Sequence, residues 1–257
     1  MKVIFENLGR IRYKEAWDYQ EQLFETIIRA KSDTRAKPES GTGIEKCGEV
    51  NGEVYGEEEK KKEKEQYLLF CEHEHVYTLG KHGDKQNLLI ANHVCKSRNI
   101  DLHTIDRGGD ITYHGPGQLV AYPIIDLEVF GMGIKKYIST LEDVVIDTLE
   151  SYGIKGEKDE KAMGVWIDAA DPAKARKICA IGVRASRFVT MHGLALNVNT
   201  DLSYFNYINP CGFRDRGVTS IQKELGYETD FEEVSGRMKK AFADRFGMEL
   251  SYRLKHF

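Results

Sequence analysis

Apolar residues recur with a helical period in three segments of the chain. The first segment contains Ala16, Trp17, Leu23, Ile27 and Ile28, the second Ile134, Ile138, Leu141, Val145 and Leu149, and the third Phe231, Val234, Met238, Phe242 and Phe246. Spacings of three, four and seven residues place such side chains on one face of a helix. We therefore expect three amphipathic helices, each packed on another element.

Short runs that are apolar or alternate between apolar and polar residues, separated by Gly, Asn or Pro, predict strands. These runs are residues 67–71, 76–79, 103–106, 118–127, 164–167, 177–184 and 188–198. The last two are joined by only a few residues and predict an antiparallel hairpin. Because the regular strand–helix alternation of a doubly wound fold is absent, the sequence predicts an α+β fold, with helices packed on a sheet.

Residues 32–65 interrupt this pattern, because they contain few large apolar side chains and end in a dense run of Glu and Lys. Such a composition is typical of a mobile surface insertion, with Glu and Lys able to pair at helical spacing near its end. A docking arm for a partner is the alternative interpretation. The length suits one large domain or two small ones, and we expect a single catalytic domain over residues 1–257 that contains this insertion.

Charge and cysteine content limit the possible classes of protein. Lys and Arg number 37 and Asp and Glu 41, which gives a net charge of −4 and disfavours a nucleic-acid partner. The five cysteines are an odd number without regular spacing, and no secretory signal precedes them, so we expect free thiols in a reducing cytoplasm. The longest apolar runs fall short of the roughly 20 residues that cross a bilayer, so we expect a soluble protein.

Cys211 lies in a segment, residues 209–217, that is typical of a polar turn. Pro210 and Gly212 favour a tight turn, which leaves the thiol without an apolar environment. Arg214 and Arg216 bring positive charge, which favours the thiolate. A reactive cysteine and an incidental surface cysteine fit this segment about equally well.

A second candidate segment, residues 107–118, is rich in glycine. The backbone N–H groups of Gly108 and Gly109 could face a carbonyl or an oxyanion, and Arg107 and His114 could donate hydrogen bonds to it. The segment has neither the phosphate-loop pattern nor the dinucleotide fingerprint. A pair of tight turns is the structural alternative.

Lys177 opens an otherwise apolar run, which places an ammonium group at the rim of a buried surface. By itself it is typical of a solvated charge at a strand end. An ammonium about 4 Å from a thiol would stabilise the thiolate by about 4 kcal/mol at an effective dielectric constant near 20. Lys177 could therefore ionise Cys211 if the fold brought the two together.

Two histidine-containing groups offer other chemistry. Cys71, His73 and His75 alternate along one run, so they could share a strand face and bind zinc, although no second Cys/His pair completes a finger-like site. His114 and His192 keep open a Cys-His nucleophile arrangement with Cys211. A satisfied, partly buried histidine is the simpler interpretation of His192.

Taken together, these segments resemble the lipoyl(octanoyl) transferase family of the biotin and lipoyl protein ligase superfamily. The resemblance covers residues 67–222 and rests on the motifs at 72–73, 76–80, 107–114, 117–118, 122–123, 177–184, 210–212 and 217–220. It implies a mixed, largely antiparallel sheet flanked by helices. The insertion at 32–65 is longer than is usual in the family, and Cys179 replaces a small residue, which would put an extra thiol near the site.

The resemblance implies transfer of an octanoyl group from octanoyl-acyl carrier protein. Cys211 would attack the thioester, and a lysine ε-amine would then take the acyl group, on lipoyl domains of 2-oxoacid dehydrogenase complexes or on the glycine cleavage H protein. Lys177 would lower the pKa of the thiol and later accept the proton of the amine. No ATP, metal or other cofactor, no nucleic acid and no membrane would take part, and the location would be cytoplasmic.

The acyl group would lie in a slot of small and apolar residues, where exclusion of water protects the thioester. The residues implied to bind substrate are Arg107, Gly108, Gly109, Asp110, Ile111, Thr112, Tyr113, His114, Ala180, Ile181, Gly182, Gly193, Leu194 and Ala195. Three other functions remain open: an ATP-dependent lipoate or biotin protein ligase, a thiol hydrolase that uses Cys211 with a histidine, and a zinc- or effector-binding protein.

Overall fold

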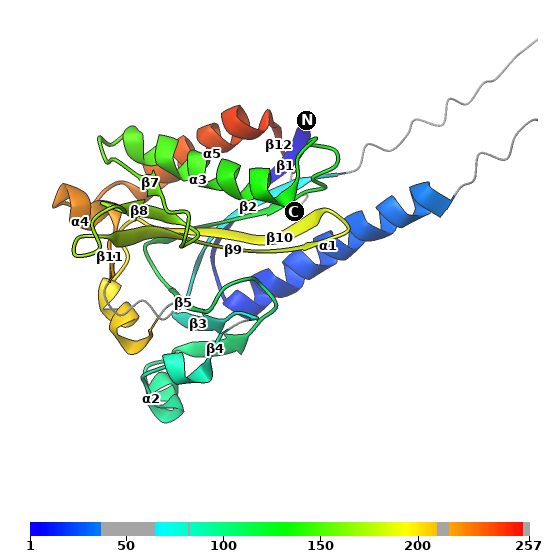
Figure 1. Cartoon of the computed structure of the whole chain (residues 1–257). Helices are drawn as coiled ribbons and strands as arrows, with labels where there is room; N and C mark the ends of the chain where they lie inside the picture. The colour runs from blue at the N-terminus through cyan, green and yellow to red at the C-terminus, as the bar shows by residue number, and fades with distance from the viewer. Residues whose placement is uncertain (37–64, 82, 210–215, 254–257) are drawn as a thin grey trace, which may run out of the picture.

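The computed structural model describes residues 1–36, 65–81, 83–209 and 216–253, and these residues build two sheets (Figure 1). The strands of the large sheet are β1 (Lys2–Ile11), β2 (Tyr67–His73), β6 (Gln118–Ile124), β7 (Glu157–Lys158), β8 (Val165–Ile167), β9 (Arg176–Ser186), β10 (Val189–Asn197), β11 (Gly217–Val218) and β12 (Glu249–Tyr252). Their order is β12-β1-β2-β6-β10-β9-β8-β7, with β11 beside β9.

Most neighbouring strands of the large sheet are antiparallel. This holds from β2 through β6, β10, β9 and β8 to β7, whereas β12 and β2 run parallel to β1, and β11 runs parallel to β9. The prediction of an α+β fold with a mixed, largely antiparallel sheet is therefore confirmed. The predicted hairpin is also present, as β9 and β10 joined by Arg187 and Phe188.

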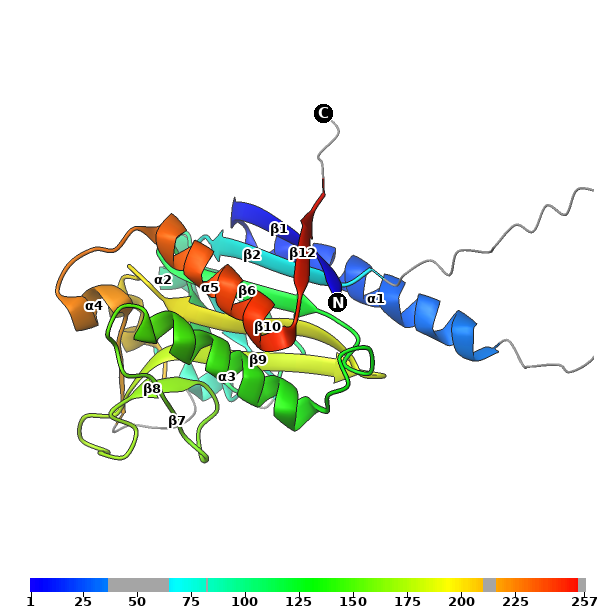
Figure 2. The same ribbon diagram turned by 90° about the horizontal axis from the view of Figure 1, so that it is seen from above.

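Helices cover both faces of the large sheet, as the two views show (Figures 1 and 2). The helices α3 (Ile134–Glu150) and α5 (Phe231–Phe246) pack against one face, and α1 (Tyr13–Ala36) packs against the other. A short helix, α4 (Ile221–Leu225), follows β11. The three predicted helices are confirmed, and none of the helices in the described part of the chain is both long enough and apolar enough to cross a membrane.

The small sheet has the order β4-β3-β5. Its strands are β3 (Val76–Leu79), β4 (Asp101–Thr104) and β5 (Ile111–His114), and the helix α2 (Asn92–Ser97) and the 3-10 turns η1 (Lys85–Asn87) and η2 (Leu202–Tyr207) accompany it. A separate apolar cluster holds these elements together, with Tyr77 and Tyr113 fully buried at its centre. Because β5 leads within a few residues into β6, the small sheet is held beside the large one.

Several elements differ from the sequence predictions. Strand β1 was not predicted, and β4 begins two residues before the predicted run at 103–106. Strand β5 lies inside the glycine-rich segment, which is therefore more than a pair of turns. Helix α1 continues to Ala36, so the first residues of the predicted insertion are helical, and residues 37–64 lie outside the described part of the chain.

Candidate active site

A cavity of about 380 Å³ is lined by residues of both sheets and of α1. The residues implied to bind substrate line it in two groups: Arg107, Gly109, Asp110, Ile111, Thr112 and His114 from the glycine-rich segment, and Ala180, Ile181, Gly182, Gly193, Leu194 and Ala195 from the β9–β10 hairpin. Pockets for small molecules have volumes of about 300–1,000 Å³. The fold thus brings together two sequence motifs that lie some 70 residues apart.

Two of the implied residues, Gly108 and Tyr113, do not line this cavity. The N–H of Gly108 donates to the carbonyl of Val183 at 3.0 Å, so it ties the glycine-rich segment to β9 and cannot face a ligand. Tyr113 is fully buried in the small sheet, and its hydroxyl is hydrogen-bonded to His75 Nδ1 at 2.7 Å. Tyr113 belongs instead to the apolar cluster that holds the small sheet together.

Small residues let the chain pack closely around the middle of the cavity. A side chain at Gly193 would come within 2.1 Å of the carbonyl oxygen of Ala121, and one at Gly182 within 2.9 Å of Arg107 Cδ. These two glycines face each other across the hairpin. Beside them Ala180 and Leu194 provide an apolar wall, a surface suited to an alkyl chain.

Lys177 lines the cavity where β9 begins. Its ammonium donates to the carbonyl of Met163 at 3.0 Å and lies 4.7 Å from the centre of the Trp166 ring. The guanidinium of Arg216 lies 4.9 Å from the same ring and forms an ion pair with Asp159. Two cations therefore gather around one indole, whose own N–H donates to Ala162 O at 2.7 Å.

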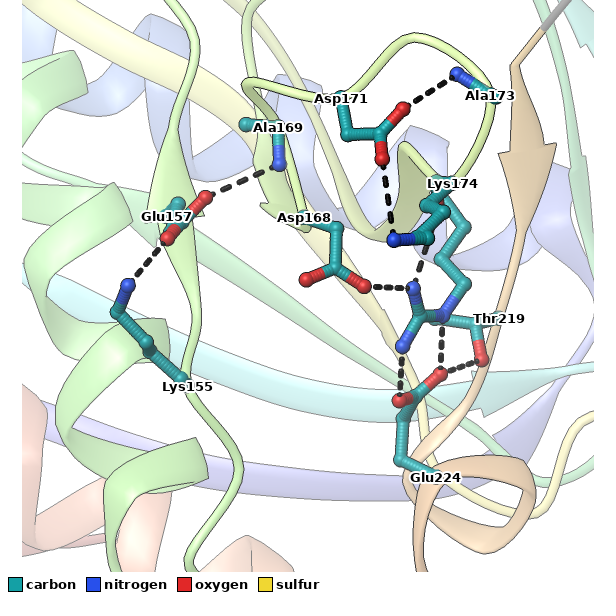
Figure 3. A network of polar contacts seen from close by, with 10 residues as sticks. Lys155, Glu157, Asp168, Ala169, Asp171, Ala173, Lys174, Thr219 and Glu224 are labelled. Carbon is teal, nitrogen blue, oxygen red and sulfur yellow. Dashed lines mark hydrogen bonds and ion pairs between the residues drawn. The ribbon is translucent and has the colours of Figure 1, made fainter.

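A polar network holds the strand end next to Lys177 (Figure 3). Arg176 donates to both carboxylate oxygens of Glu224, at 2.7 and 2.6 Å, and to Asp168 at 2.5 Å. The hydroxyl of Thr219 donates to the same Glu224 carboxylate. The hydrogen bond from Arg176 lowers the pKa of Glu224, although burial of the carboxylate opposes this change. The network joins β9 to α4 and so fixes the backbone that carries Lys177.

The other end of the cavity is polar and buried. The Arg107 guanidinium donates to the carbonyl and the hydroxyl of Thr78, at 2.8 and 2.9 Å, so it supports the small sheet as well as lining the cavity. His114 Nδ1 is hydrogen-bonded to Gln118 Oε1 at 2.7 Å, and burial keeps the pKa of His114 well below its usual range. Tyr13, the first residue of α1, stacks on His114. These groups are neutral or paired inside the protein.

His192 also lies at this buried end. Its Nε2 is 3.2 Å from Asp106 Oδ1, and Asp106 in turn forms an ion pair with Arg184 at 2.6 Å. Burial lowers the pKa of His192, although the hydrogen bond to Asp106 opposes this change. The other ring nitrogen, Nδ1, is buried and has no hydrogen-bond partner among the described residues. The simpler interpretation from sequence, a satisfied, partly buried histidine, therefore holds for Nε2 but not for Nδ1.

The proposed nucleophile, Cys211, lies outside the described residues. Within the described part of the chain, Cys71, Cys95 and Cys179 are free and buried. Burial raises the pKa of each of these thiols, which keeps them protonated and unreactive. Cys179 lies on β9 next to Ala180, which lines the cavity, but its own side chain packs in the core on the α3 side of the sheet and does not line the cavity.

The predicted metal alternative is not favoured by the geometry. Cys71 Sγ lies 3.5 Å from His73 Nε2, but that nitrogen also bonds the Tyr122 hydroxyl at 2.7 Å. His75 follows the end of β2 and stacks on Tyr204 instead. In residues 1–36, 65–81, 83–209 and 216–253, no cluster of three or more His, Cys, Asp and Glu side chains is arranged to hold a metal.

Sequence reasoning missed several residues of the cavity wall. Tyr13, Trp166, Phe205 and Val218 line it from four different parts of the chain. Only Trp166 carried a usable signal, because a tryptophan brings a large apolar ring together with an N–H that needs a partner when buried. The others are ordinary helix, turn or strand residues whose role depends on long-range packing.

Comparison with known proteins identifies the family. Residues 53–243 match the family model described as the lipoyl protein ligase A/B catalytic domain. An octanoyltransferase from Bacteroides fragilis is 50% identical over 238 residues, which are 93% of this chain and 95% of that protein. The chain belongs to the octanoyltransferase family. The resemblance seen in the sequence and the predicted class of enzyme, an acyltransferase, are thereby confirmed.

Two further matches add a relative of different length and a shared fold. An octanoyltransferase from Porphyromonas gingivalis is 49% identical over 243 residues, which are 95% of this chain but only 44% of that protein. This chain therefore spans less than half of that relative. A bipartite lipoate protein ligase from Thermoplasma acidophilum superposes with a TM-score of 0.64 at 15% identity, over 99% of this chain and 88% of that one. At this identity the likeness shows the fold alone.

Proposed function

We propose that this protein transfers an octanoyl group from octanoyl-acyl carrier protein to a lysine ε-amine of a lipoyl domain, through a thioester at Cys211. The acceptors would be lipoyl domains of 2-oxoacid dehydrogenase complexes and the glycine cleavage H protein. The observation that carries the proposal is the cavity, whose apolar middle lies next to the ammonium of Lys177. Membership of the octanoyltransferase family supports octanoyl as the group that is transferred.

The chemistry takes two steps. The Cys211 thiolate attacks the thioester carbonyl carbon, and the bond to the carrier sulfur breaks as the acyl-enzyme bond forms. The leaving carrier thiolate takes the proton of the Lys177 ammonium, so that Lys177 is a neutral amine when the acceptor arrives. The acceptor amine then attacks the acyl-enzyme, the bond to sulfur breaks, and Lys177 takes the proton that the amine loses. Amide formation from a thioester runs downhill, so the transfer needs no ATP.

The position of Lys177 supports these roles. Its ammonium donates to the carbonyl of Met163 and lies over the ring of Trp166, and Arg216 lies over the same ring. Positive charge at this end of the cavity favours a thiolate over a thiol. In sequence Cys211 precedes Arg216 by only five residues, and Arg216 lines the cavity.

We further propose that residues 1–257 act as one catalytic domain, with 32–65 as an insertion in it. The support is that a single cavity takes its wall from the small sheet, the large sheet and α1 together. Neither sheet alone would enclose an acyl chain.

An ATP-dependent lipoate or biotin protein ligase is the closest alternative, because the matching family model is described as a lipoyl protein ligase catalytic domain. A ligase activates a free acid and needs no cysteine nucleophile. The two functions therefore differ in their need for ATP and for Cys211.

The deciding experiment is intact-protein mass spectrometry after mixing the enzyme with octanoyl-acyl carrier protein without ATP. We expect one octanoyl adduct that hydroxylamine removes, present in wild type and absent from Cys211→Ser. Lys177→Ala should form the adduct at least tenfold more slowly, because it loses the charge that favours the thiolate. Cys47→Ser is the matched control and should acylate like wild type.

Addition of a lipoyl domain should then discharge the adduct and shift the mass of the domain instead. An unmodified enzyme that acts only on free octanoate with ATP would contradict the proposal and favour a ligase. An adduct that persists in Cys211→Ser would place the nucleophile elsewhere.

A further inference from the structure

One peptide group, between Met163 and Gly164, connects Lys177 with a buried acid. The carbonyl oxygen of this group, on Met163, accepts a hydrogen bond from the Lys177 ammonium at 3.0 Å. The N–H of the same group, on Gly164, donates to Glu142 Oε1 at 3.3 Å. A carboxylate from α3 and a cation from β9 therefore contact the two polar ends of a single peptide group.

Close packing restricts the orientation of this peptide group. Gly164 has a φ of +122°, and a side chain there would come within 2.4 Å of the carbonyl oxygen of Cys179 on β9, so the position requires glycine. The pairing of β8 with β9 is irregular at the next step, between Val165 and Trp166. Such irregularities redirect side chains and are common next to active sites. The backbone thus holds the Met163 carbonyl toward Lys177.

Glu142 lies outside the cavity. It is 8% exposed and is not among the residues that line the cavity. Burial raises the pKa of Glu142, whereas the hydrogen bond from Gly164 and the charge of Lys158 oppose this change. Burying a carboxylate is unfavourable unless polar groups compensate for the lost water. The N–H of Gly164 provides such compensation, and it links Glu142 to the cavity wall.

Other charged groups lie near both ends of this connection. Those on the cavity side are Arg216, which is paired with Asp159, and Lys161, and those on the α3 side are Asp143 and Lys158, which pair with each other at 2.7 Å. Two further cations therefore line the cavity together with Lys177. Like charges disfavour the protonated form of a lysine, so a strong acceptor for the ammonium is needed to offset them.

A carboxylate at the N–H end makes the peptide carbonyl a stronger acceptor, because hydrogen bonds in a chain polarise one another. The path from Glu142 Oε1 through the peptide group to Lys177 Nζ is at most about 9 Å long. At that distance and an effective dielectric constant near 20, a unit negative charge favours the ammonium by about one pH unit. Glu142 therefore acts on both the direction and the strength of the acceptor that Lys177 uses.

We propose that Glu142 is a positioning residue for Lys177, which holds the ammonium in place and favours its protonated form through the Met163–Gly164 peptide group. The inference rests on the proposed function for the role of Lys177 in the reaction, and it deepens that role. In the first step Lys177 stabilises the Cys211 thiolate and gives a proton to the leaving carrier thiolate, and both tasks require the ammonium. Glu142 extends the range of pH over which the ammonium is present.

Three variants separate the charge of Glu142 from its hydrogen bond and from neighbouring charge. Glu142→Gln keeps an oxygen that can accept from Gly164 but removes the charge, and Glu142→Ala removes both. Asp143→Asn is the matched control, because it removes the next carboxylate on the same helix, which pairs with Lys158 instead. Glu142→Gln relieves the cost of a buried charge, so we expect it to fold. Circular dichroism checks this for each variant.

The pKa of Lys177 is measured by competitive labelling with trace acetic anhydride between pH 6 and pH 11, followed by unfolding and complete labelling with the deuterated reagent. Trypsin then cuts only at arginines, and the peptide of residues 177–184 carries Lys177 as its single lysine. We expect the pKa of Lys177 to be about one pH unit lower in Glu142→Gln. It should be at least as low in Glu142→Ala and unchanged in Asp143→Asn. If Glu142→Gln does not fold, the result for Glu142→Ala decides.

The rate of acyl-enzyme formation is measured over the same range of pH. Because the first step requires the ammonium, this rate falls as the pH rises through the pKa of Lys177, and the fall should begin about one pH unit lower in Glu142→Gln. A purely structural role for Glu142 would lower the rate without moving its pH dependence.

The two measurements allow the two proposals to fail separately. An unchanged pKa of Lys177 in both Glu142 variants, or an equal fall in Asp143→Asn, would overturn the inference whatever the transfer assay shows. A lower pKa of Lys177 in a protein that forms no octanoyl adduct would leave the link between Glu142 and Lys177 in place and reject the transferase.

Discussion

Trp166 lies beside two of the cations that line the cavity. Its ring is buried, its N–H is held by Ala162, and its face lies within 5 Å of both the Lys177 ammonium and the Arg216 guanidinium. A cation over an indole face gains about 0.5–2 kcal/mol. The tryptophan thus acts through Lys177, as a residue that positions the ammonium.

Replacing Trp166 should affect acylation in proportion to the loss of the aromatic face. Trp166→Phe keeps a ring and should acylate at close to the wild-type rate, whereas Trp166→Leu should acylate about 2- to 30-fold more slowly, the equivalent of that cation–π energy. The measurement is the rate of acyl-enzyme formation, scaled to the folded fraction from circular dichroism. Equal rates in both variants would show that the ring contributes packing only.

At the scale of elements, a polar network anchors the start of β9. Arg176, Glu224, Asp168 and Thr219 bring together β9, β11 and α4 at this point (Figure 3). Bidentate contacts between Arg and a carboxylate are among the strongest hydrogen bonds on a protein surface. The side chain of Glu224 is 14% exposed, so solvent screens the pair only in part.

Removing the Glu224 charge should therefore destabilise the fold measurably. We expect Glu224→Gln to lower the free energy of unfolding by about 1.5–3 kcal/mol, the range for hydrogen bonds to charged groups. Asp244→Asn serves as the control, because it breaks only an exposed pair with Lys240, and exposed pairs contribute little to stability. Urea unfolding at pH 7 provides both values. A loss in Glu224→Gln no larger than in Asp244→Asn would show that the network contributes little.

The extent of sequence-based prediction also differs between elements. The period-3.6 pattern located α3 and α5, and the β9–β10 hairpin was evident because its two strands are adjacent in sequence. Strand β1 was not predicted, because buried and more exposed residues alternate only in its first half and because its partners β2 and β12 come from distant parts of the chain. Parallel pairing over such separations leaves no local signal.

For the whole molecule, the cavity could be predicted as a set of motifs but not as a shape. The glycine-rich pattern selected residues 107–118, the family resemblance added residues 180–182, and the fold brings most of them to one wall. The direction of each side chain depended on details that no pattern carries, such as the positive φ of His192 or the apolar cluster of the small sheet that contains Tyr113. The residue types indicated which reactions the cavity could support, but the directions of the side chains depended on tertiary contacts.

The molecule also buries several histidines in their neutral form, and this links its stability to pH. Burial lowers the pKa of His73 to about 4, and it also lowers the pKa of His114 and His192. Unfolded histidine has a pKa near 6.5, so below that pH the unfolded chain binds protons that the folded chain does not. Stability is therefore complete above about pH 6.5 and falls as the pH falls.

Urea unfolding between pH 7.5 and 5 should reveal this coupling. Each buried histidine contributes a slope of up to about 1.4 kcal/mol per pH unit below 6.5, and His73 alone accounts for about 3 kcal/mol by pH 4. His73→Gln should be less stable than wild type at pH 7.5, because it loses the hydrogen bonds to Ile11 and Tyr122, but its stability should fall less steeply with acid. His93→Gln, at an exposed position, should keep the wild-type slope. If His73→Gln also kept the wild-type slope, the loss of stability in acid would have a cause other than protonation of His73.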